Sequence, residues 1–478
     1  MRSALIFSTL AASVALSSAR AQTPTEKPPA PGPLRPYSVP AVQTFTLANG
    51  VRVALIEKHT LPIVTARIRL DAGAVREPSD KSGVAVLTAN LLSEGAAGMT
   101  GAQIADTMAS LGAQFGTSGS YGSAFANVTS LPTVFSDALS VAAKSVTTPT
   151  FTESDFNRLR ATAIAAYERN QSTAEGVAAK IFNWALFEPT TPYSRLSGGN
   201  KASLSALTRE DVLKWHSTMY SPKNTTVMIV GDITPRQART IVERALGSWN
   251  VPGSTPAPLA NRAKQVSANR IILVDRPGSV QSGVVIGQAA DGWESSDVIA
   301  LQAAAQVLGG GFGSRMNMNL REKHGWTYGA FAAFGPLQQT GTFSFNSAIR
   351  TNATDSAIAE AVREFRRLAS EPVTSEELSD QLANVIASFP NSVQTVQGLL
   401  NNLATIVTYG LPLDYYSTYR ERLAAVTPAD ITRLGKTKLA PNALTIVAVG
   451  DLKTIEAPIR ALNLGTVEVW DSEGNKVR

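Results

Sequence analysis

The sequence predicts an α+β fold made of two homologous halves, each a mainly antiparallel sheet covered by helices. A pattern that occurs twice supports this prediction: residues 208–232 and 427–451 each pass from a Thr N-cap with an acidic first turn, through a proline turn, into an apolar strand ending in Val-Gly-Asp. In both halves strand patterns come before helical patterns, which is typical of a sheet with helices packed on it.

The strands are indicated by turn chemistry and by alternation. Residues 45–57 predict a hairpin around Asn49-Gly50, a dipeptide that favours a type I′ turn, and residues 63–70 alternate apolar and polar side chains. Further strands are expected at 125–131, 270–275 and 281–288. Helical periodicity predicts helices at 135–145, 153–170, 175–186, 355–370 and 375–388.

The first 21 residues have the features of a secretory signal. Arg2 precedes an apolar stretch at 4–16 that is too short to cross a bilayer, and Ala19-Arg20-Ala21 fits a cleavage site. We therefore expect cleavage near Ala21 and a periplasmic or secreted protein, and the lack of cysteine fits an oxidising compartment. A Pro-rich tether (22–41), an N-terminal half (42–250), a Pro- and Ala-rich linker (251–265) and a C-terminal half (266–478) complete the expected organisation.

Composition excludes some classes of function. The chain is 44% hydrophobic, enough for a large core, and its net charge of +6 is spread without a dense Lys/Arg run, so we expect no nucleic-acid partner. No stretch after the signal reaches transmembrane length, so we expect no integral membrane segment.

Residues 308–328, LGGGFGSRMNMNLREKHGWTY, form the most informative segment. They predict a glycine turn, a helical turn with Met316 and Leu320, a stop at Gly325 and a strand carrying Tyr328. As a phosphate loop the glycine run lacks a following Gly-Lys-Ser/Thr, and as a dinucleotide fingerprint it lacks the preceding strand. A helix-entry turn that allows close backbone approach is the better interpretation.

This segment closely resembles the second-half segment of the insulinase/pitrilysin metallopeptidases, the family that includes the mitochondrial processing peptidase. The resemblance covers nearly the whole mature chain and implies two halves that face each other across a cavity. It also implies that Arg321 and Tyr328 hold the backbone of a peptide substrate while zinc in the other half cuts it.

The family's zinc motif, H-x-x-E-H on a helix after G-x-A, is degenerate in this chain. In the corresponding stretch, residues 82–92, the motif positions hold Val86, Ala89 and Asn90. Valine and alanine can neither bind zinc nor abstract a proton, and a lone amide is a poor zinc ligand. We expect no catalytic residue of this motif and no metal in this chain.

Other residues do not supply the missing ligands. The three histidines, His59, His216 and His324, lie far apart in the sequence, and we interpret each as structural or solvent-exposed. Glu168 and Glu175 resemble the acidic pair from which active members draw a third ligand, but which of the two matches stays open. Without the histidines, two carboxylates on a solvated helix face are the preferred interpretation.

The sequence therefore supports two hypotheses. The first is a non-catalytic, substrate-binding subunit of a heterodimeric periplasmic zinc metallopeptidase, with the zinc held by a homologous partner and with Arg321 and Tyr328 completing a composite site. The alternative is a stand-alone peptide-binding or scaffold protein without proteolytic activity. An independent enzyme has no supporting constellation, because neither a G-x-S-x-G elbow nor a cysteine nucleophile is present.

Overall fold

The computed structural model describes residues 36–252, 263–264 and 266–478. The expected signal (1–21), most of the tether (22–41) and most of the linker (251–265) lie outside the described residues, and the expected domain boundaries stay predictions. Residues 38–478 belong to one compact unit. Among the described residues, none of the helices combines the length and apolar character that a membrane crossing requires.

The first sheet has the strand order β1-β2-β8-β3-β7-β6. Its strands are β1 (Gln43–Thr46), β2 (Arg52–Glu57), β3 (Val64–Leu70), β6 (Gln114–Gly119), β7 (Ala124–Ser130) and β8 (Thr225–Gly231). Only the β2–β8 pair is parallel. The short strands β4 (Gly95–Ala96) and β5 (Met99–Thr100) form a separate hairpin.

The second sheet has the order β11-β12-β10-β13-β9-β14. Its strands are β9 (Arg270–Asp275), β10 (Gln281–Asp291), β11 (Phe331–Pro336), β12 (Thr340–Arg350), β13 (Thr445–Gly450) and β14 (Thr466–Trp470). The three pairs from β11 to β13 are antiparallel, and β9 pairs in parallel with both β13 and β14.

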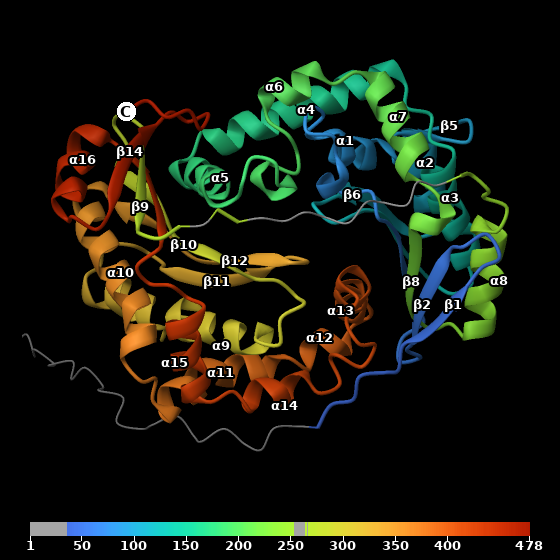
Figure 1. The fold of residues 1–478 in the computed structure, drawn as a ribbon. Helices are drawn as coiled ribbons and strands as arrows, with labels where there is room; N and C mark the ends of the chain where they lie inside the picture. Colours follow the sequence, from blue (N-terminus) through green and yellow to red (C-terminus); the bar gives the residue numbers. More distant parts are fainter. Residues whose placement is uncertain (1–35, 253–262, 265) are drawn as a thin grey trace, which may run out of the picture. The chain divides into compact units, whose positions relative to one another are not determined.

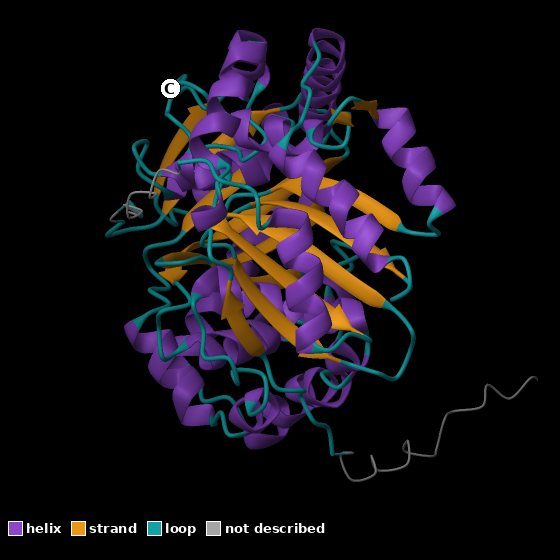
Figure 2. Cartoon of the chain, turned by 90° about the vertical axis from the view of Figure 1, so that its right-hand side faces the viewer, coloured by secondary structure: helices purple, strands orange, loops and turns teal. Residues whose placement is uncertain are grey.

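Helices pack against both sheets (Figure 1, Figure 2). Those before the linker are α1 (Val84–Leu91), α2 (Gly101–Ser110), α3 (Phe135–Thr147), α4 (Glu153–Gln171), α5 (Ala174–Leu186), α6 (Lys201–Ala206), α7 (Arg209–Met219) and α8 (Pro235–Leu246). Those after it are α9 (Val298–Gly309), α10 (Thr354–Ser370), α11 (Ser375–Ser388), α12 (Asn391–Gln394), α13 (Val396–Tyr409), α14 (Tyr419–Ala424), α15 (Pro428–Thr437) and α16 (Leu452–Ala461).

The repeated sequence pattern has the same structure in both halves. Thr208 caps α7 and Thr427 caps α15, each in a capping box with the aspartate three residues later. The strands that follow, β8 and β13, lie inside the first and second sheets. The prediction of two sheet-and-helix halves, mainly antiparallel, is confirmed.

Each sheet has an apolar core on one face and a helix from the opposite half of the sequence on the other. In the first sheet the core lies against α1, α3 and α8, and α13 packs on β3 and β8. In the second sheet the core lies against α9 and α10, and α5 packs on β10 and β13. Each half of the sequence therefore contributes one helix to the sheet of the other half.

The exchanged helices begin in the same way. Thr173 caps α5 by accepting a hydrogen bond from Gly176 N, and Thr395 caps α13 by accepting one from Gly398 N. A Cβ added at Gly176 would lie 2.1 Å from the carbonyl oxygen of Asn170, and one at Gly398 would lie 2.3 Å from that of Ser392. Both helix starts therefore need glycine for close backbone approach, which adds to the internal repeat.

Candidate functional site

Helix α1 keeps its fold although its motif positions carry no suitable metal ligands. It packs against edge strand β6 at Gly119, where an added Cβ would lie 2.8 Å from the Val86 Cα and 3.2 Å from the Ala89 Cβ. Ala89 is buried, whereas Val86 and Asn90 are half-buried. The side chains at these positions do not fit a zinc ion, because only the Asn90 amide has a donor atom. Across the described residues, no group of three or more His, Cys, Asp or Glu side chains is placed to hold a metal.

The N-terminus of α1 is held by a buried carboxyl group. The Glu77 carboxyl group accepts hydrogen bonds from the backbone N–H groups of Gly83 (3.1 Å) and Ala85 (2.7 Å). Burial raises the pKa of Glu77 to about 8, and the hydrogen bonds from Ala85 and Gly83 and the charge of Arg195 oppose this rise. Glu77 therefore positions the start of the helix. Its role could not be predicted from the sequence, because a single glutamate after a turn forms no recognisable pattern.

The acidic pair is split between two places. Glu168 on α4 accepts a hydrogen bond from Lys201 Nζ at 2.6 Å and is half-exposed. Glu175, at the start of α5, lines a cavity on the second sheet. The pair therefore does not act as one unit.

Each histidine has a local partner. His59 Nδ1 lies 2.6 Å from Asp232 Oδ1, and this hydrogen bond raises the pKa of His59. His216 is mostly buried, with Nε2 2.8 Å from the Val146 carbonyl oxygen, and burial lowers the pKa of its ring. His324 stacks on Trp326 with ring centroids 4.1 Å apart. These contacts fit structural roles.

The segment with Arg321 forms a π-helix, Asn317–Lys323. Met316 and Leu320 are buried, as the predicted helical turn requires, and Gly325 ends the turn with φ of +61°. The prediction of a strand carrying Tyr328 is wrong, because β11 begins only at Phe331. Before that, Thr327 Oγ1 bonds to Gly329 N–H and to the Ser347 hydroxyl, so the chain bends at Tyr328 and does not enter the ladder.

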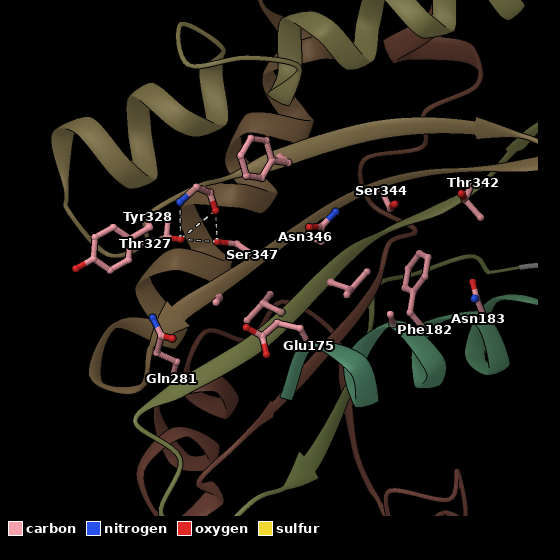
Figure 3. Close-up of a pocket in the computed structure, with 16 residues that line it drawn as sticks. Glu175, Phe182, Asn183, Gln281, Thr327, Tyr328, Thr342, Ser344, Asn346 and Ser347 are labelled. Atoms are coloured by element: carbon pink, nitrogen blue, oxygen red, sulfur yellow. Dashed lines mark hydrogen bonds between the residues drawn. The ribbon is translucent and has the colours of Figure 1, made fainter. Parts of the chain in front are cut away.

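Tyr328 is 90% exposed and lines a cavity of about 630 Å³ on the second sheet (Figure 3). The polar side chains Thr342, Ser344 and Asn346 lie along β12, and Glu175, Phe182 and Asn183 of α5 line the cavity from the other side (Figure 3). Alternation of these polar residues with buried Phe343 and Phe345 could have indicated this face from the sequence. The cavity offers hydrogen-bond donors and acceptors, aromatic surface and one carboxylate.

Arg321 is not among the residues that line this cavity. Its Nη1 lies 3.3 Å from Glu322 Oε1, and its guanidinium lies 4.8 Å from the centroid of the Phe312 ring. Tyr328 and Glu175 therefore line the same cavity, whereas the guanidinium of Arg321 lies over the Phe312 ring.

Two family models match the chain in succession. Residues 52–192 match insulinase (peptidase family M16), and residues 206–385 match the peptidase M16 inactive domain. The chain belongs to the M16 family. The similarity to a solved M16 structure extends over most of the fold. A peptidase M16 inactive domain from Pseudomonas fluorescens superposes on this chain with a TM-score of 0.79 at 26% identity, over 86% of this chain and 98% of that one.

A protease from Helicobacter pylori has the same fold, with a TM-score of 0.80 at 19% identity over 86% of this chain and all of that one. Among curated M16 relatives, the non-peptidase homolog YmxG of Helicobacter pylori is 21% identical over 85% of this chain and 93% of its own length. The zinc protease PqqE of the same organism is 26% identical over 43% of this chain and 46% of its own length. An uncharacterized zinc protease of Streptomyces coelicolor is 23% identical, and the match spans 57% of that relative.

Proposed function

We propose that this chain is the non-catalytic, substrate-binding subunit of a heteromeric M16 metallopeptidase. A homologous partner holds the zinc, and this chain contributes Arg321 and Tyr328 to the composite site. The location proposed for the complex is the periplasm, or outside the cell, after removal of the signal near Ala21. The observation that carries the proposal is the combination of a helix α1 without zinc ligands and an exposed Tyr328 at a cavity with both polar and apolar lining residues.

The chemistry of the cavity fits an extended peptide. Tyr328 lies just before β11, an edge strand of the second sheet, where a peptide backbone can add hydrogen bonds. A phenol hydroxyl and a guanidinium both donate to peptide carbonyl oxygens. The occurrence of a non-peptidase homolog and a zinc protease in one organism supports a division of labour between two related chains.

The first test uses a complex with a zinc-bearing subunit that has an intact H-x-x-E-H motif. Tyr328→Phe and Arg321→Ala should each lower kcat/KM for peptide cleavage by about one to two decades, because a lost donor leaves a substrate carbonyl unpaired at a cost of about 1–3 kcal/mol. Assembly and zinc content should not change. Arg321→Ala should have the larger effect, because a charged fork makes the stronger contact.

The matched control is Arg244→Ala, which removes a 68% exposed arginine from α8. Wild-type cleavage by assembled complexes containing Tyr328→Phe or Arg321→Ala would contradict the composite site.

The stand-alone peptide-binding protein is the second candidate, and the position of Arg321 favours it. Because the guanidinium pairs with Glu322 and lies over Phe312, it can act as a local structural group. Under this alternative the chain binds peptide through the Tyr328 cavity, no partner is needed, and Arg321→Ala has no effect on peptide affinity.

A further inference from the structure

The face of the first sheet that carries α13 has an unusual charge distribution. Three arginines lie on it: Arg67 and Arg69 of β3, and Arg52 of β2. The register places Arg52 and Arg69 on either side of Thr226, and Arg67 two residues from Arg69 on the same face. Glu57, the acidic residue of β2, has the opposite parity to Arg52 and lies on the other face.

Within the described part of the chain, none of these three arginines forms an ion pair with a carboxylate, and their hydrogen bonds go to neutral groups. Arg67 Nε donates to Asn127 Oδ1 (2.7 Å), and its Nη2 donates to Asn401 Oδ1 of α13 (3.3 Å). Arg69 Nε donates to Thr408 Oγ1 of α13 (3.1 Å), and Arg52 Nε donates to Thr226 Oγ1 (3.2 Å). Helix α13 contains no acidic residue, and nor do β3, β6, β7 and β8.

The charge of Asp71, which follows β3, acts on Arg69, but the Asp71 carboxylate is paired with Arg76 at 3.2 Å. Burial lowers the pKa of both Arg67 and Arg69, and at Arg69 the charge of Asp71 opposes this decrease. Holding uncompensated arginines on a polar face costs stability unless an anion joins them.

A row of paired residues leads from Arg67 to the edge of the sheet. In register, Arg67 faces Asn127 of β7, and Asn127 faces Gly116 of edge strand β6, so these three residues form one row on the face. Gly116 is exposed, and a Cβ added there would meet nothing within 4 Å. A chain that passes over Gly116 can therefore bring a side chain to the guanidinium of Arg67.

We infer that this face selects acidic peptides, with Arg67 as the residue that contacts glutamate or aspartate side chains of the substrate. Arg69, which is buried, and Arg52, which is exposed, add to the positive potential of the same face. The inference rests on the proposed peptide-binding function and names its substrate class. It uses the first sheet, whereas Tyr328 belongs to the cavity of the second.

The test compares three fluorescent peptides of equal length, alike except that the same positions carry Glu, Gln or Lys. Their affinities for the full mature chain are measured by fluorescence anisotropy. Wild-type protein should bind the Glu peptide about tenfold more tightly than the Gln peptide, as one charge-assisted contact predicts, and the Lys peptide most weakly. The preference should fall at high salt.

Arg67→Gln should remove the preference, so that the ratio of the affinities for the Glu and Gln peptides falls from about ten to about one. The matched control Arg244→Gln should keep the preference. Gly116→Val suits a strand and fills the open space over β6, so it should weaken the Glu peptide and retain the wild-type melting temperature.

Equal affinity for the Glu and Lys peptides, or a full preference in Arg67→Gln, would overturn the inference. If the Gln peptide still binds in that case, and Tyr328→Phe weakens it, the proposed peptide-binding function survives alone. Failure of all three peptides to bind, both to the chain alone and to its complex with a zinc-bearing subunit, would contradict the proposed function and this inference together.

Discussion

At the scale of single residues, local contacts decide what a charged side chain does. The Glu77 carboxyl group is buried and accepts from two backbone N–H groups at the start of α1. The guanidinium of Arg321 lies over the Phe312 ring.

Glu77 makes a testable contribution to pH dependence. Its folded-state pKa of about 8 lies above the ordinary value of 4.5, so the folded chain binds a proton that the unfolded chain has lost between these values. The stability linked to this proton is fully present below the ordinary value and is lost as the pH rises towards the folded pKa. Glu77 should therefore contribute a decrease in melting temperature between about pH 5 and about pH 8.

Glu77→Gln keeps an acceptor oxygen for Gly83 and Ala85 but does not titrate, so its melting temperature should fall less over the same range. The control Glu168→Gln, which changes a half-exposed carboxylate, should retain the wild-type slope. An unchanged slope in Glu77→Gln, measured by thermal unfolding at several pH values, would refute this role.

The residues of the candidate site differ in how far the sequence predicts them. Val86, Ala89 and Asn90 could be found by counting from Gly83, because a motif fixes their spacing. The role of Glu77 could not be predicted, because it depends on burial and on two N–H groups that the fold brings to it. The position of Arg321 could be predicted, but its contact with Phe312 could not.

At the scale of elements, several helices and strands were predicted, but strand β12, helix α13 and the packing of α5 and α13 on opposite sheets were not. The expected helix at 375–388 matches α11, and the expected strand at 270–275 matches β9. Edge strands β6 and β11 were not predicted, because glycine and alanine interrupt their alternation. The strand expected at Tyr328 is a bend because side-chain hydrogen bonds of Thr327 replace the ladder.

Because α5 packs on the second sheet, we expect a truncation of its buried Ile181 side chain to lower the stability of the protein strongly. This side chain is fully buried in the apolar cluster that α5 shares with β9, β10 and β13. Ile181→Ala should lower the free energy of unfolding by about 2–5 kcal/mol, as for other large-to-small core changes. Urea unfolding measures it, with Leu213→Ala on α7, 38% exposed, as the control. Equal effects of the two substitutions would show that α5 does not hold the halves together.

At the scale of the whole molecule, the duplication was visible because its capping boxes and strands recur in sequence. The reciprocal packing of α5 and α13 was not visible, because periodicity shows that a helix has an apolar face but not which sheet covers it. The three arginines on one face of the first sheet could not be predicted from the sequence for a similar reason. Arg52 and Arg69 come to lie on either side of Thr226 only through the pairing of β2 and β3 with β8. Signal, tether and location stay predictions.

We expect this M16 chain to carry no catalytic zinc of its own. Elemental analysis of the purified mature chain, after exposure to excess zinc and removal of loosely bound metal, tests this directly. We expect far less than one zinc per chain, because Val86 and Ala89 have no donor atoms and Glu168 and Glu175 lie in different surroundings. One tightly bound zinc per chain would contradict it.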